Sequence, residues 1–101
     1  MSQDVTLTRF AVKAQLDEVD VQNSQELASL WGTIRGEAEE LGIDIHSIDA
    51  VIGEFDFLLI VEVPSGDDVV KLSVLMQRHG LDVKTMPLVP EEQFANLVVD
   101  V

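Results

Sequence analysis

Residues 53–64 read GEFDFLLIVEVP and predict a tight turn that leads into a strand. Gly53 can adopt the positive φ that a short hairpin turn requires. Pro64 lacks the N–H that a sheet ladder needs, so the strand is expected to end before it. A second β-rich run, Ile43–Ile52, lies immediately before the turn. We therefore expect Ile43–Ile52 and Phe55–Val63 to pair as a β-hairpin.

Two helical patterns flank this hairpin. In residues 24–41 the apolar residues recur at steps of three and four, which places them on one face of a helix. Gly42 can end this helix in the left-handed conformation. A second helical pattern covers residues 69–79 and ends at Gly80. The apolar stripe of the first helix consists of Leu27, Leu30, Trp31, Ile34, Ala38 and Leu41.

The remaining elements complete a β-α-β-β-α-β order. Val5–Ala14 is rich in β-branched residues and predicts a first strand. Leu81–Val89 predicts a fourth strand, with Pro87 marking an edge-like end, and residues 90–94 predict a short final helix. This order is that of the split βαβ, ferredoxin-like unit. We expect an α+β sandwich, a single domain over residues 1–101, with two helices on one face of a four-stranded antiparallel sheet.

Composition and charge limit the functions that the chain can have. It has 101 residues, of which 47% are apolar, so it can bury one core and is not disordered. It has no cysteine, which excludes disulfides and thiolate metal sites. Nineteen acidic residues against six lysines and arginines give a net charge of −13. That charge repels nucleic acids and anionic membranes, so neither is an expected partner.

The acidic residues are spread along the whole chain, and lysine is scarce. This pattern favours a cytoplasmic protein of a salt-rich cell, because concentrated salt screens the self-repulsion of a highly charged fold. An ordinary acidic protein is the alternative. No apolar run approaches the length of a membrane span, and no basic region with an apolar stretch opens the chain. We therefore expect no membrane segment, no signal peptide and a cytoplasmic location.

The third strand has two apolar sides. Because side chains alternate along a strand, the side opposite the core carries Asp56 and Glu62 at its ends but Leu58 and Ile60 at its centre. A solvated sheet face is normally polar throughout. The side expected under the helices carries Phe55, Phe57, Leu59, Val61 and Val63.

An apolar centre on an open sheet face marks an interaction site. Symmetric homodimers are the commonest soluble oligomers. We therefore expect a homodimer joined through the open sheet faces, as a dimeric α+β barrel. The alternative is that scattered apolar residues on a sheet surface need no partner.

The second half of the chain resembles the GYD family of small proteins. In the family pattern a Gly-X-Tyr-Asp turn leads a strand that ends in Glu-X-Pro. Here Phe55 replaces the tyrosine, whereas Asp56, Glu62 and Pro64 match, and the resemblance covers roughly Ile48–Phe94. It implies a ferredoxin-like fold and a tendency to form dimeric α+β barrels, and it implies no settled activity.

The candidate residues for a ligand site are Arg9, His46, Phe55, Asp56 and Glu62. Asp56 and Glu62 lie six residues apart on one strand, which is about 20 Å and too far for a pair of catalytic carboxylates. Structural roles are the alternative, with Asp56 ordering the hairpin turn and Glu62 solvating the end of the strand.

A metal site at His46 is not expected. His46 and Asp44 share a strand face, but Asp49 breaks the alternation, and no second His lies at ligand spacing. The sequence also has no glycine-rich phosphate loop and no nucleophile elbow. We expect no cofactor, and no catalytic residue is assigned.

The function that these features favour is a homodimeric module that binds a small ligand or has a regulatory role. The alternative is a small cofactor-free enzyme of the oxygenase or isomerase type, which would use a cavity between the sheet and the helices; it rests on analogy of fold alone. A third interpretation is an accessory protein that meets a basic partner through its acidic surface.

Overall fold

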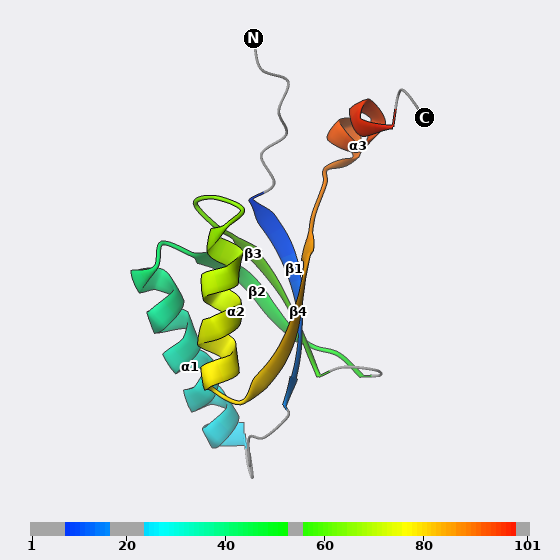
Figure 1. Cartoon of the computed structure of the whole chain (residues 1–101). Coiled ribbons are helices and arrows are strands. Elements are labelled where there is room, and N and C mark those ends of the chain that lie inside the picture. Colours follow the sequence, from blue (N-terminus) through cyan, green and yellow to red (C-terminus); the bar gives the residue numbers. More distant parts are fainter. Residues whose placement is uncertain (1–7, 17–23, 53–55, 99–101) are drawn as a thin grey trace.

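The computed structural model describes residues 8–16, 24–52 and 56–98. Strands β1 (Arg9–Leu16), β2 (Asp44–Ala50), β3 (Phe57–Glu62) and β4 (Leu81–Pro87) form one antiparallel sheet in the order β2-β3-β1-β4. Helices α1 (Ser24–Glu40) and α2 (Asp68–Arg78) cover one face of the sheet, and α3 (Glu91–Leu97) lies beyond its end (Figure 1). The expected α+β, ferredoxin-like fold is confirmed.

The core lies between the sheet and the two long helices. Along β3, Leu59 and Val61 are fully buried on the helix side, which confirms the alternation expected from the sequence. Trp31 of α1 packs edge-to-face against Phe57, with ring centroids 5.0 Å apart. The helices contribute to the same core Ile34, Ala38, Leu72, Leu75 and Met76.

Two glycines end the helices as the sequence predicts. Gly42 has φ +76° and Gly80 has φ +81°, a conformation that side-chain-bearing residues rarely adopt. A Cβ at Gly42 would also lie 3.4 Å from Cγ of Pro64, so the turn from α1 into β2 has little space for a side chain. These turns direct the chain back along the sheet after each helix.

The start of α2 is held by local polar contacts. Asp68 accepts hydrogen bonds from the backbone N–H and the hydroxyl of Ser65, each at 3.1 Å. The Lys71 ammonium lies 3.0 Å from the Asp68 carboxylate and, with the Ser65 hydrogen bonds, lowers the pKa of that carboxyl below its usual value. At the other end, His79 Nε2 lies 2.6 Å from Glu37 Oε1 and joins the end of α2 to α1.

Several expected boundaries differ in the first half of the fold. The first strand extends to Leu16, beyond the expected end at Ala14, because its last residues continue to pair with β4. Thr8 precedes the strand, and residues 5–7 lie outside the described residues. Leu41, expected in the apolar stripe of the first helix, follows α1 in the turn and is 39% exposed.

The second half differs in smaller ways. The strand β3 ends at Glu62 instead of the expected Val63, and β4 ends at Pro87 instead of the expected Val89. Pro87 offers no N–H for a longer ladder. The last helix runs from Glu91 to Leu97, further than expected, and Pro90 precedes it. The predicted hairpin turn and Phe55 lie in residues 53–55, outside the described residues.

Candidate functional site

The face of the sheet away from the helices is organised in rows that cross the strands. In the central row, Ile60 of β3 lies between Ser47 of β2 and Ala11 of β1, and Ala11 pairs with Met86 of β4. In the next row, Leu58 pairs with Asp49 of β2 and with Lys13 of β1. The apolar centre of this open face therefore consists of Ala11, Leu58, Ile60 and Met86, of which Met86 is 39% exposed.

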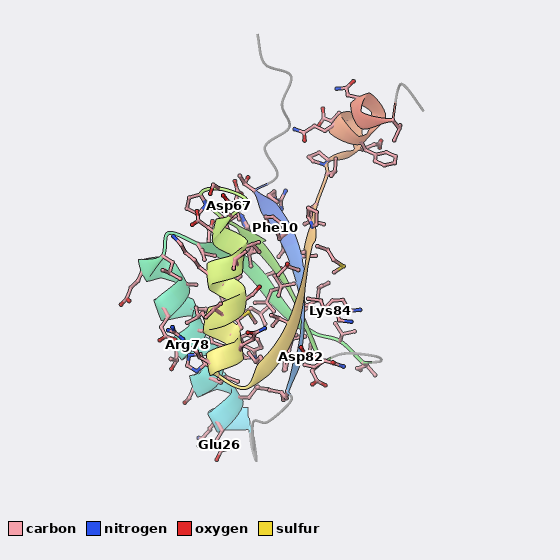
Figure 2. All side chains as sticks on the ribbon, in the orientation of Figure 1. Phe10, Glu26, Asp67, Arg78, Asp82 and Lys84 are labelled. Carbon is pink, nitrogen blue, oxygen red and sulfur yellow. The ribbon has the colours of Figure 1, made fainter. Side chains whose placement is uncertain are left out.

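Charge on the open face is divided between its two halves. The acidic half, on β2 and β3, carries Asp44, Asp49, Asp56 and Glu62. The basic half, on β1 and β4, carries Arg9, Lys13 and Lys84, together with Asp82. Figure 2 shows Lys84 on the side of β4 that points away from the helices. Only the strand order β2-β3-β1-β4 brings these charges into two halves.

A cluster of ionisable groups lies at one end of the open face. A β-bulge between Ile45 and Ser47 makes His46 an extra residue of β2. Nε2 of His46 lies 3.1 Å from Oε1 of Glu62 and 3.7 Å from Oδ2 of Asp44, and its side chain is 39% exposed. Arg9 pairs with Glu62 in the β1–β3 register. This end therefore combines a cation, an imidazole and two carboxylates.

A small pocket of about 150 Å³ adjoins this cluster where β4 leads toward α3. Arg9, Thr8 and Gln93 provide hydrogen-bonding groups, and the pocket is completed by Glu62, Leu88 and Pro90. A few polar groups in a partly apolar lining are typical of small-ligand sites.

Residues 10–98 match the family model of the GYD domain. The chain belongs to the GYD domain family. The match runs from β1 to the end of α3, so the extent expected from the sequence, roughly Ile48–Phe94, was too short. The motifs that carry the resemblance are short and concentrated in the second half, whereas a family model also scores the positions between them. No curated protein matches the chain in sequence.

Three of the five candidate residues come together in this GYD domain. Arg9 and Glu62 line the same pocket, and His46 contacts Glu62. Asp56 lies at the opposite end of β3, where its Oδ2 accepts the Leu16 N–H at 2.8 Å. Asp56 therefore fastens the end of β1, and the turn that it was expected to order lies outside the described residues. Phe55 lies outside the described residues.

Thr8, Gln93 and Leu88 were missed by reasoning from the sequence. They belong to the GYD domain's pocket because the segment after β4 passes beside the start of β1, where the Leu88 N–H donates to the Arg9 carbonyl at 2.8 Å. No periodicity or motif signals this proximity. Only the tertiary path of the chain brings these residues to Arg9.

Two further findings concern the described parts of the GYD domain, residues 8–16, 24–52 and 56–98. They contain no group of three or more His, Asp or Glu side chains arranged to hold a metal ion. Among their helices, none combines the length and the apolar character needed to cross a membrane.

Proposed function

We propose that this GYD domain is a homodimeric module that binds a small ligand or has a regulatory role, and that its subunits join through their open sheet faces. The apolar centre of the open face carries this proposal. It lies in the middle of the sheet with charged residues on both sides, the arrangement of an interface with an apolar core and a polar rim. Such a surface favours burial against a partner.

The two charged halves favour a second copy as that partner. When two sheets pack face to face, a two-fold axis parallel to the strands sets β2 of one subunit over β4 of the other. The acidic half then lies over the basic half, twice in each dimer. An axis across the strands would set β2 over β2 and acid over acid, which costs binding energy. Charge therefore selects the first arrangement.

The registers specify which residues meet across this interface. Asp49 pairs with Leu58, Leu58 pairs with Lys13, and Lys13 pairs with Lys84. Asp49 and Lys84 therefore lie in one row, at opposite edges of the sheet. A two-fold axis parallel to the strands keeps rows in register, so Asp49 of one subunit approaches Lys84 of the other. Neither residue makes an ion pair with another of the described residues. The same axis places Ile60 beside Ala11 of the second subunit.

The ligand site in this proposal is the pocket beside Arg9. The Arg9 guanidinium offers donors to a carbonyl or hydroxyl oxygen, and the Glu62 carboxylate accepts from a donor on the same ligand. Leu88 and Pro90 contact the apolar part. A neutral amphipathic ligand fits better than an anion, because the chain's net charge of −13 repels anions.

Binding of the neutral molecule acetanilide, which has a carbonyl acceptor on a single aromatic ring and is small enough for the pocket, tests this site. Titration calorimetry is expected to detect its binding, and Arg9→Gln is expected to weaken binding about tenfold because a hydrogen bond to a charged donor is lost. Arg78→Gln, which removes an exposed cation from α2, is the matched control. Equal affinity of wild type and Arg9→Gln would remove Arg9 from the site.

A cofactor-free enzyme is the second candidate function, and one contact supports it. The Glu62 carboxylate holds the His46 imidazole at 3.1 Å, as a carboxylate orients a general base. His46→Gln separates the two candidates. Loss of turnover at unchanged substrate affinity would identify an enzyme, whereas a binding module is expected to change only in affinity.

We also propose that the domain works in concentrated salt, in the cytoplasm of a salt-rich cell. The net charge of −13 in 101 residues supports this, since self-repulsion opposes folding and the joining of two such chains. Molar salt shortens the Debye length to about 3 Å and screens this repulsion.

A further inference from the structure

The strand β2 forms one edge of the sheet, as the strand order shows. One row of its backbone N–H and C=O groups therefore points away from β3 and is available for pairing. The opposite edge, β4, differs because α2 packs closely on it and Pro87 ends it. The available edge of the described sheet is thus that of β2.

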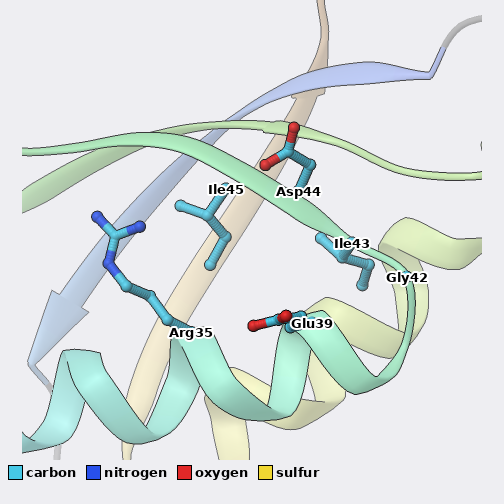
Figure 3. A pocket seen from close by; sticks show the side chains of 6 residues that line it. All are labelled: Arg35, Glu39, Gly42, Ile43, Asp44 and Ile45. Atoms are coloured by element: carbon cyan, nitrogen blue, oxygen red, sulfur yellow. The ribbon is translucent and has the colours of Figure 1, made fainter.

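A groove of about 460 Å³ runs between this edge and α1. Figure 3 shows Arg35 and Glu39 of α1 on one side and the first residues of β2 on the other. Ile43 is 4% exposed and Ile45 is half-buried, so they supply an apolar wall. The groove thus combines backbone pairing groups with an apolar wall and charged side chains.

Charge is polarised along the groove. Arg35 lies toward Ile45, whereas Glu39 lies toward the turn that joins α1 to β2 (Figure 3). Arg35 makes no ion pair within the described residues. One end of the groove is therefore suited to a carboxylate and the other to a cation.

We propose that this groove binds an extended peptide as a fifth strand beside β2. An extended backbone is the chemical partner that a row of strand N–H and C=O groups fits, and alternate side chains of such a peptide would face the apolar wall. Arg35 receives a carboxylate of the peptide in this arrangement. Glu39 receives a positively charged side chain.

The β2 edge of a second copy fits this groove poorly. Antiparallel pairing of two β2 strands about their centre would set Asp44 of one opposite Asp49 of the other, and like charges directly opposite destabilise a sheet. The β-bulge at His46 also interrupts the register of two identical strands. The charges favour a separate peptide that carries both signs.

Binding of two fluorescein-labelled hexapeptides, Lys-Val-Thr-Val-Thr-Glu and the same residues in reverse order, tests the proposal. The two peptides carry the lysine and the glutamate at opposite ends. One of them therefore suits parallel addition to β2 and the other antiparallel addition. At least one peptide is expected to bind, and Arg35→Gln is expected to weaken it about tenfold, as does replacing the peptide glutamate by glutamine. Combining the two changes is expected to cause no further loss of affinity, because each of them removes the same contact, that between Arg35 and the peptide glutamate.

Two controls keep the test specific to strand addition. The same peptide with every backbone nitrogen methylated keeps its side chains but has no backbone N–H to donate from either edge, so it is expected not to bind. Hydrogen exchange is expected to slow in residues 44–50 and not in β4. Failure of both peptides to bind overturns the proposal, as does equal binding of the methylated peptide.

Arg78→Gln is the matched control for Arg35→Gln, because it removes the charge of an exposed arginine on α2, outside the groove. The groove lies on the helix side of the sheet edge, so Arg35→Gln is expected to leave the oligomeric state unchanged. Failure of this proposal and failure of the proposed dimer are therefore separately visible.

Discussion

Replacing Ile60 with lysine is expected to convert the proposed dimer into a folded monomer, with a dissociation constant raised at least about a hundredfold. Ile60 is half-buried at the centre of the open face, in the row that contains Ala11 and Met86. Near a two-fold axis the two introduced ammonium groups would approach each other in an apolar interface, and burying an unpaired charge costs several kcal/mol. Light scattering measures the mass, and circular dichroism checks the fold.

Val70→Lys is the matched control for this change. Val70 lies on α2, is 61% exposed, and is on the helix side of the molecule. The same gain of positive charge there is expected to leave the dimer intact. If the Ile60→Lys variant remained a dimer as stable as the wild type, the open face would not be the interface.

Exchanging the charges of Asp49 and Lys84 is the second large effect. Asp49→Lys alone sets two lysines against each other at two symmetric places, and Lys84→Asp alone does the same with two aspartates. Each single variant is expected to dimerise at least about tenfold more weakly, because like charges across an interface are unfavourable. The double variant, with the two charges exchanged, is expected to return to within about threefold of the wild type.

This experiment depends on the salt concentration. It is informative at the lowest KCl concentration that keeps all variants folded, because molar salt screens the contact. Arg78→Asp, which makes the same change in net charge as Lys84→Asp but on α2, is expected to leave the dimer unchanged. A double variant no tighter than the single ones would contradict a two-fold axis parallel to the strands.

The elements whose apolar residues recur with a clear period were predictable from the sequence. The alternation of β3 correctly placed Leu59 and Val61 in the core, and the three- and four-residue steps of α1 correctly placed Trp31 and Ile34 there. Gly42 was identifiable because a helix commonly ends in the left-handed conformation. In each case the structure follows from local geometry alone.

The region around His46 shows why the rest was not predictable. On a strict period of two, Asp49 breaks the alternation of Asp44 and His46. The bulge at His46 explains this break: it adds one residue, so Asp44 and Asp49 both reach the open face. The bulge depends on pairing with β3, and the contact of His46 with Glu62 follows from that pairing. A single strand's sequence contains neither.

The pocket and the charged halves depend on still longer-range features. Gln93 meets Arg9 only because the chain after β4 passes the start of β1. Lys84 joins the basic half only because β4 pairs with β1 at one edge, while β2 lies at the other. These are properties of strand order and chain path, which no pattern along the sequence encodes.

The mass of the protein in molar KCl and in dilute buffer tests the central claim, that the open face is an interface between two copies of the chain. Light scattering in molar KCl is expected to give twice the chain mass of 11.1 kDa. In dilute buffer the same sample is expected to dissociate or unfold as its charges are no longer screened. A folded monomer in both solutions would contradict the claim and would mean that the apolar centre of the open face belongs to a different partner.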